Sequence, residues 1–213
     1  MISVDIKISR LWKKYSGKKT TIWIKGYFYS HTIDKIVNIC KNIKKDEISS
    51  FIESIDGHFA IVVHKDDFTF IAVDKIRSTP LFFTKIKDNF FIDSDPKNLV
   101  NLNSFDKIIE ENARLEIAMS GFVIGNKTIY NNLHSLKAGE IVIFQGNSYE
   151  YLQYYKYFGE IINKSFEDYL KELSEVTLNI FRKMLNKIGD RQIIIPLSAG
   201  NDSRLVASIL KHL

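Results

Sequence analysis

Four short apolar segments, rich in β-branched and aromatic residues, follow one another closely in the first half of the chain. Segments with this composition are typical of strands. The turns between them are too short to hold a crossover helix, so the pattern predicts antiparallel pairing within a sheet. Two further strands are expected, one on each side of this group. The predicted strands cover residues 58–64, 69–74, 81–85 and 89–92, with 20–29 before them and 141–144 after them.

An amphipathic helix is predicted directly after the first of these strands. Its apolar residues recur every three or four positions from Ile33 to Ile43, and Thr32 is placed to cap its N-terminus. This spacing puts Cys40 on the buried stripe, so we interpret its thiol as part of the core and not as a nucleophile. Cys40 is the only cysteine of the 213 residues, and no internal disulfide can form, which agrees with a cytoplasmic location.

Composition excludes several classes of protein. Hydrophobic residues make up 45% and charged residues 26%, which indicates a soluble folded chain. The net charge of +5 comes mostly from lysine, whereas recognition of phosphate and bases favours arginine, so we do not expect nucleic-acid binding. No apolar run approaches the roughly 20 residues that span a bilayer. The N-terminus lacks the features of a secretory signal, so we expect no membrane contact.

The composition changes near residues 154–159, where strand signals give way to a long amphipathic helix. Ser165 and Asp168 have the spacing of an N-terminal cap, and Gly189 ends an apolar stripe that we expect to be core. An apolar strand is predicted at 192–197, followed by a small polar loop and a second helix.

A strand, a polar loop and a helix in this order form an anion-binding arrangement. Small residues let backbone N–H groups approach a phosphate, and Asp202 could share a Mg²⁺ ion with it. The alternative is an ordinary turn, because Ser, Gly and Asp are also frequent in strand-to-helix connections.

Several motifs in a fixed order resemble those of the asparagine synthetase family. Ile55-Asp56-Gly57-His58-Phe59-Ala60 resembles Leu-Asp-Gly-x-Phe-Ala, and the loop Ser198-Ala199-Gly200-Asn201-Asp202-Ser203 resembles the family's pyrophosphate loop Ser-Gly-Gly-x-Asp-Ser. The stretch from Val73 to Phe83 resembles Arg-Asp-x-x-Gly-x-x-Pro-Leu-Tyr-Tyr, and that from Ser94 to Leu99 resembles Ser-Glu-x-Lys-x-Leu. A series of weak motifs in one order is more specific than any one of them.

The resemblance implies an α+β chain in two parts. Residues 1–158 would form a degenerate glutamine amidotransferase domain, an Ntn-hydrolase-like αββα sandwich that is shortened at its N-terminus. Residues 159–213 would begin an α/β ATP-binding domain of the pyrophosphate-loop type with its first strand and helices. ATP and Mg²⁺ are the implied cofactors, and a carboxylate acceptor and ammonia or glutamine are the other substrates. The implied ATP site comprises Leu197, Ser198, Gly200, Asp202 and Ser203, with Asp202 as the metal ligand.

The chain departs from the family at the glutaminase site. The family's nucleophile is an N-terminal cysteine whose own α-amine acts as base, but Ile2 stands in that place, so we predict no catalytic residue and no glutamine hydrolysis. Gly26 and Asp56 are interpreted as the remnant of a glutamine-binding site.

Two functions stay open. The chain is either the leading part of an ATP-dependent carboxylate–amine ligase, inactive alone, or a non-catalytic interaction domain of the same family. We expect a fragment of a larger protein and a homodimer; the motifs name neither the acceptor nor the nitrogen source.

Overall fold

The computed structural model describes residues 1–4, 6, 11–160 and 162–213. The chain has a mixed α+β fold with β-sheets, and it divides into two compact units, Met1–Tyr157 and Phe158–Leu213. We call them the N-terminal unit and the C-terminal unit and describe each by itself. None of the helices in the described ranges has both the length and the apolarity needed to cross a bilayer.

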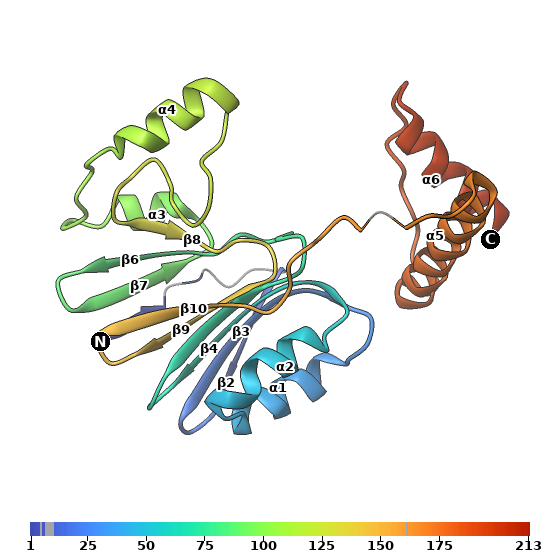
Figure 1. Ribbon diagram of the computed structural model, residues 1–213. Helices are drawn as coiled ribbons and strands as arrows, with labels where there is room; N and C mark the ends of the chain where they lie inside the picture. The colour runs from blue at the N-terminus through green and yellow to red at the C-terminus, as the bar shows by residue number, and fades with distance from the viewer. Residues whose placement is uncertain (5, 7–10, 161) are drawn as a thin grey trace. The chain divides into compact units, whose positions relative to one another are not determined.

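The larger sheet of the N-terminal unit has six strands in the order β10-β9-β5-β4-β3-β2, and every neighbouring pair is antiparallel. Helices α1 and α2, joined by a short 3₁₀ turn at Lys45–Glu47, cover one face of this sheet (Figure 1). The elements of this layer pair are β2 (Trp12–Ser16), β3 (Thr20–Phe28), α1 (Ile33–Asn42), α2 (Ile48–Glu53), β4 (Gly57–Lys65), β5 (Thr69–Val73), β9 (Glu140–Gln145) and β10 (Ser148–Gln153).

The smaller sheet has four strands in the order β1-β7-β6-β8. Strand β1 runs parallel to β7, and the other pairs are antiparallel. Helix α3 packs on this sheet, and α4 follows it along the chain (Figure 1). The elements are β1 (Ile2–Val4), β6 (Phe82–Ile86), β7 (Asn89–Asp93), α3 (Pro96–Val100), α4 (Glu111–Ser120) and β8 (Leu133–Ser135).

The two sheets pack face to face because side chains alternate along each strand. Phe83 and Phe90 point into a core shared with Val62 of the larger sheet, whereas their neighbours Phe82 and Phe91 point outward toward α3. The sequence predicts one sheet from these four closely spaced strands, and this prediction is wrong. They form two pairs in different sheets. The loop between β5 and β6 carries the chain from one sheet to the other, so the pair β4–β5 and the pair β6–β7 lie in different layers.

A basic and aromatic segment near the N-terminus supplies the edge strand of the larger sheet. A stretch this rich in basic residues is usually a solvated face, but residues 12–16 form β2, and the Trp12 side chain is only 4% exposed. Arg10 lies outside the described residues. Lys13 and Lys14 remain exposed, and the Lys14 ammonium lies 5.1 Å from the Trp23 ring centroid. Lysines along an edge strand discourage pairing with another chain.

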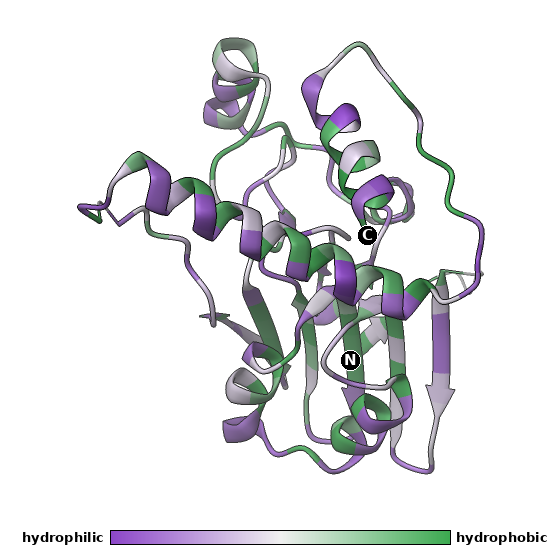
Figure 2. Cartoon of the chain, turned by 90° about the vertical axis from the view of Figure 1, so that its right-hand side faces the viewer, coloured by the Kyte–Doolittle hydropathy of each residue, from purple (hydrophilic) through white to green (hydrophobic). Residues whose placement is uncertain are grey.

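The described residues of the C-terminal unit form two helices, α5 (Phe166–Ile188) and α6 (Asn201–His212). Helix α5 begins where the sequence predicts, because the Ser165 hydroxyl accepts a hydrogen bond from the Asp168 backbone N–H, and Gly189 follows its last turn. Apolar and polar residues alternate along both helices (Figure 2). The prediction that the apolar stripe of α5 is core is wrong for this chain: Phe166 is 74% exposed and Leu173 64% exposed.

The strand predicted at 192–197 does not form. This segment has no regular secondary structure, and Ile194 is 83% exposed. A strand needs a neighbour to pair with its backbone N–H and C=O groups, and the described residues of the C-terminal unit supply none.

Candidate functional site

Gly26 lies in β3, at a position where any side chain would point into the backbone of β4. It is paired with Phe59, and a Cβ atom in its place would lie 2.0 Å from the carbonyl oxygen of His58. Its φ of +133° is one that side-chain-bearing residues rarely adopt. The pairing of β3 with β4 therefore requires glycine at this position, whether or not the position also contacts a ligand.

Asp56 lies at the same end of the β3–β4 pair, just before Gly57, whose partner is Phe28. Its backbone is fixed on both sides: the N–H donates to the Ser30 hydroxyl at 2.9 Å, and the C=O accepts from the Tyr29 N–H at 2.8 Å. Asp56 is exposed. Burial and the nearby Asp56 carboxylate raise the pKa of the Tyr29 hydroxyl. The structure thus brings the two predicted glutamine-binding residues to one end of the sheet; their role stays a prediction.

Cys40 lies on the buried face of α1 and has no measurable exposure. Burial raises the pKa of its thiol to about 12, against a smaller opposing effect of Lys65. A thiol must be accessible and deprotonated to attack a substrate. This confirms the expectation that Cys40 is core, and it leaves the described chain without a cysteine nucleophile.

Asp74 joins two of the motifs. It is 1% exposed, and its carboxylate accepts backbone hydrogen bonds from Phe59, Ile76 and Ser78 at 3.0, 2.9 and 3.0 Å, together with a bond from the Ser78 hydroxyl. Three convergent N–H donors fix a carboxylate and the loop around it. Asp74 therefore holds the loop at residues 74–81 against the start of strand β4.

Arg77 lies in this loop with a left-handed φ of 55°, at the position where the motif has glycine. Burial lowers the pKa of its guanidinium, and the Glu140 carboxylate acts in the opposite direction. Arg77 is therefore a half-buried cation, stabilised by the charge of Glu140, in a backbone conformation that is costly for any residue with a Cβ.

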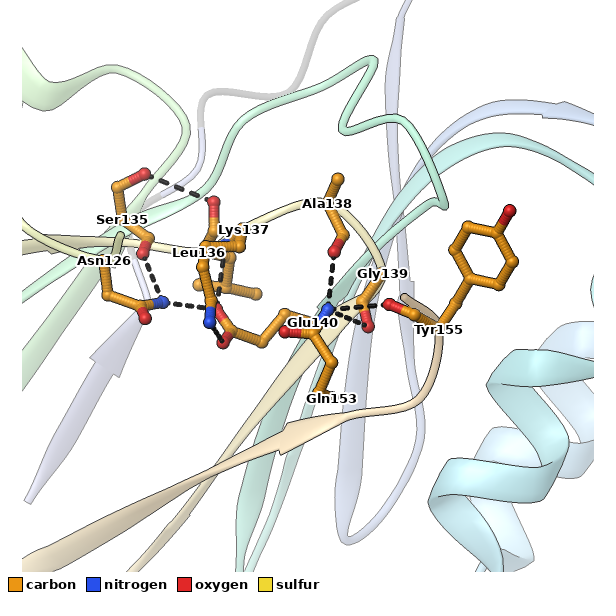
Figure 3. Close-up of polar contacts among 9 residues, drawn as sticks. All are labelled: Asn126, Ser135, Leu136, Lys137, Ala138, Gly139, Glu140, Gln153 and Tyr155. Carbon is orange, nitrogen blue, oxygen red and sulfur yellow. Dashed lines mark hydrogen bonds and ion pairs between the residues drawn. The ribbon is translucent and has the colours of Figure 1, made fainter. Parts of the chain in front are cut away.

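The Glu140 side chain holds the turn that precedes β9 by hydrogen bonds (Figure 3). Its carboxylate is 1% exposed and accepts hydrogen bonds from the Lys137 N–H at 2.8 Å and from the Asn126 side-chain amide. The Lys137 ammonium lies 3.4 Å from its other oxygen. The Asn126 amide also donates to the Ser135 carbonyl, so one buried carboxylate ties the 126 segment to the start of β9.

Gly139 completes the same turn with φ +66°. A Cβ atom at this position would lie 2.5 Å from the Tyr155 carbonyl oxygen. The Gln153 side-chain amide donates to the carbonyls of Ala138 and Tyr155, at 2.8 and 2.7 Å, which clips the turn to the segment after β10 (Figure 3). This cluster is structural, because its polar atoms bond to one another.

The predicted pyrophosphate loop lies in the C-terminal unit. The Ser203 hydroxyl accepts from the Ser198 N–H at 3.1 Å, and the Ser198 hydroxyl accepts from the Gly200 N–H at 3.2 Å. Gly200 precedes α6, and no side-chain cap hydrogen bond is made at the start of this helix. Ser198, Gly200 and Asp202 are brought together at one helix end, and Leu197 is 68% exposed beside them.

Asp202 is exposed in the first turn of α6. Among the described residues, no cluster of three or more His, Cys, Asp or Glu side chains is placed to hold a metal ion. A Mg²⁺ ion at Asp202 would therefore take most of its oxygen ligands from phosphate and water, which is the usual way in which proteins bind magnesium with nucleotides. The free helix N-terminus fits an anion, and the single carboxylate fits a shared magnesium ion.

Sequence reasoning missed the roles of Asp74 and Glu140. Asp74 was part of a quoted motif, but its function as acceptor for three N–H groups depends on strands that meet only in the fold. Glu140 directly precedes an apolar run and follows the glycine of a turn. A charged residue in that position is the signal that would have indicated a buried carboxylate.

Residues 38–156 match the family model of the glutamine amidotransferase domain, which is more than half of the chain. The chain therefore belongs to this family. The matched range ends next to the boundary between the two units and does not include the 198–203 loop. No curated protein matches the chain.

Two solved structures are among those similar to the chain. One is glutamine phosphoribosylpyrophosphate amidotransferase from B. subtilis, complexed with ADP and GMP, at 12% identity and a TM-score of 0.43, over 70% of this chain and 32% of that one. The other is described as an allosteric regulatory enzyme of purine biosynthesis, at 12% identity and a TM-score of 0.41, over 70% and 31%. The chain thus spans about a third of the length of these proteins.

Proposed function

We propose that this chain is part of an ATP-dependent carboxylate–amine ligase of the asparagine synthetase type, with an Ntn-hydrolase-like N-terminal unit that does not hydrolyse glutamine. The observation that supports it most is the family match over residues 38–156, followed in the chain by a polar loop at the start of α6. In such a ligase ATP activates a carboxylate as its adenylate, and ammonia then displaces AMP to leave an amide.

The loop and α6 would hold the nucleotide. The backbone N–H groups at the start of α6, which no side chain caps, and the positive end of the helix dipole would attract the pyrophosphate, with Ser198, Gly200 and Ser203 around them and Leu197 alongside. Asp202 would bind the magnesium ion that neutralises the same oxygens. Neutralising the charge of a leaving group is the main service that such a loop gives to catalysis.

The nitrogen would come from free ammonia or from a separate glutaminase. The only thiol of the chain is buried, and its pKa of about 12 keeps it protonated at neutral pH. Gly26 and Asp56 could at most bind glutamine, because binding needs no thiolate whereas hydrolysis by this family's mechanism does.

A non-catalytic interaction domain is the second candidate. It is favoured by two features of the C-terminal unit: the hydroxyls of Ser198 and Ser203 are engaged with each other at 3.1 Å, and the segment before them forms no strand. In a formed nucleotide site these hydroxyls would face the phosphates.

The two candidates are distinguished by titrating the full chain with ATP and Mg²⁺ while following its backbone amides by NMR. A nucleotide site predicts saturable shifts at 198–203 that depend on magnesium and are lost in Asp202→Ala. Asp190→Ala is the matched control, since Asp190 is also exposed and lies outside the loop. Shifts that are absent, or equal in both variants, contradict the ligase proposal and favour the interaction domain.

Glutamine hydrolysis is tested separately with the same protein. We expect no release of ammonia from glutamine by the chain or by Cys40→Ala. Ammonia release that persists in Cys40→Ala would show a nucleophile other than the cysteine and would contradict the proposed inactive glutaminase unit.

A further inference from the structure

A groove of about 440 Å³ lies on the outer face of the four-stranded sheet, between α3 and the segment that leads into β8. Its volume falls within the range of small-molecule sites. Pro96 and Lys97, which belong to the motif from Ser94 to Leu99, form part of one wall. The lining residues are Phe82, Pro96, Lys97, Val100, Asn101, Thr128, Ile129, Tyr130 and Leu133.

Both walls of the groove are fixed by local hydrogen bonds and packing. On one side, the Asp95 side chain caps α3 by accepting from the Lys97 N–H at 3.0 Å. On the other, the Thr128 hydroxyl donates to the Leu133 carbonyl and accepts from the Tyr130 N–H, at 3.0 and 3.1 Å. The groove therefore exists before any ligand arrives, which lowers the entropic cost of binding.

The floor of the groove is apolar and continuous with a core cluster. Leu133 is buried next to Leu99 and Phe105, and the Tyr130 ring meets the Phe105 ring edge to face at a centroid distance of 5.6 Å. Apolar side chains at the bottom of a groove favour a ligand with a hydrocarbon body.

Lys97 gives the groove its charge. It is the one charged residue among the nine that line it, and it is exposed. In the part of the chain that the structure describes, no carboxylate forms an ion pair with its ammonium. Asp95 uses its carboxylate at the helix cap, and Asn101, at the far end of α3, adds a neutral amide to the rim. The chemistry that complements this rim and this floor is one negative charge on an apolar body.

We infer that the groove binds an aliphatic monocarboxylate, with the hydrocarbon chain on Phe82, Val100 and Leu133 and the carboxylate paired with Lys97. The residues that line the groove include none of the 198–203 loop, and neither Gly26 nor Asp56, so the inference does not depend on the proposed ligase. Burial of the ligand's hydrocarbon chain supplies the affinity, and Lys97 supplies the selection for an anion.

The inference is tested by titrating the full chain with octanoate, below its micelle concentration, while following backbone amides by NMR. We expect saturable shifts confined to residues 97–101 and 128–133. Lys97→Met, which keeps the apolar stem and removes the charge, should weaken binding by roughly two- to fivefold, the loss of one solvent-exposed ion pair. The matched control is Lys107→Met, because Lys107 is exposed and does not line the groove.

Octylamine, with the same hydrocarbon chain and the opposite charge, should not produce these shifts. Absence of saturable shifts with octanoate, shifts spread over other surfaces, or equal affinity of Lys97→Met and the unchanged chain would each overturn the inference. Val100→Phe gives an independent check, because it fills the groove without changing its charge and should reduce octanoate binding.

Discussion

The carboxylate of Asp74 accepts a hydrogen bond of 3.0 Å from the backbone N–H of Phe59, fifteen residues earlier in the chain. This contact joins the motif around Asp56 to the motif that begins at Val73. The two sequence motifs therefore form one structural feature. Asp74, from the motif that begins at Val73, holds the start of β4, which lies in the motif around Asp56. The opposite side of Asp74 is fixed as well, because its carbonyl accepts from Gly139 at 2.9 Å.

Replacing Asp74 with asparagine should destabilise the N-terminal unit by roughly 2–4 kcal/mol, because an NH₂ group would face backbone N–H donors that then lose their acceptor in a buried place. The measurement is urea unfolding followed by the fluorescence of Trp12 and Trp23, which both lie in this unit. Asp66→Asn is the control, since Asp66 is exposed, and it should change stability by less than about 0.5 kcal/mol. Equal stability of the two variants would contradict the role given to Asp74.

Local signals predicted much of the fold. The Ser165 cap, the end of α5 before Gly189 and the burial of Cys40 all follow from residues within one or two helical turns, and the structure confirms them. The strands β4 to β7 were predicted within a few residues of their ends for the same reason. Spacing and turn chemistry are sufficient where neighbours in sequence are neighbours in space.

Long-range pairing could not be predicted in the same way. Ile2 pairs with Phe90, and nothing in either segment names the other as its partner. The division of four strands between two sheets and the burial of Trp12 have the same cause. Conversely, residues 192–197 have the composition of a strand, but composition cannot supply the partner that a strand needs.

The candidate site shows the same limit. Gly26 and Asp56 were identified from motif order, and the structure places them at one end of β3–β4. The buried carboxylate of Glu140 was missed, because its partner Asn126 lies fourteen residues away across a turn. A carboxylate's partners become visible only when the turn is folded.

Arg77 allows a direct measurement of backbone strain. Arg77→Gly and Arg77→Ala both remove the guanidinium, but only glycine accepts the φ of 55° without a steric penalty. We therefore expect the glycine variant to be more stable than the alanine variant by about 1 kcal/mol. This is the usual steric cost of a left-handed residue with a Cβ, reduced by the greater conformational entropy that glycine loses on folding. Urea unfolding followed by tryptophan fluorescence gives the difference. If the alanine variant were as stable as the glycine variant, the left-handed conformation would not be strained.

The buried thiol of Cys40 should make stability fall at high pH. Its pKa is about 12 in the folded chain and 9.0 when unperturbed, so between these values the unfolded chain has lost a proton that the folded chain keeps. Stability is then complete below pH 9 and declines as the pH rises toward 12, with a limiting slope of about 1.4 kcal/mol per pH unit.

The comparison that isolates this effect is Cys40→Ala, measured by urea unfolding at several pH values from 8 to 11. Tyrosines with raised pKa values, such as Tyr154, contribute equally to both proteins and cancel in the difference. The difference in stability between the unchanged chain and the variant should shrink as the pH rises. A difference that stays constant would mean that the thiol ionises as readily in the folded chain as in the unfolded one.

Two glycines with positive φ should respond very differently to alanine. At Gly26 the added Cβ would lie 2.0 Å from the His58 carbonyl oxygen and 2.7 Å from the Phe59 Cα, both of them backbone atoms of the neighbouring strand. At Gly146, with φ +58°, no atom beyond the two adjacent residues lies within 4 Å of the added Cβ. Gly146→Ala should therefore cost only the conformational penalty of about 1 kcal/mol. Gly26→Ala should cost more than about 3 kcal/mol, because β3 and β4 lie in the middle of the larger sheet and cannot separate without breaking its core. Thermal unfolding of the two variants, followed by tryptophan fluorescence, tests this ranking. Similar unfolding temperatures would show that the paired backbones of β3 and β4 can move apart at Gly26. Packing would then not be the reason that glycine is required at this position.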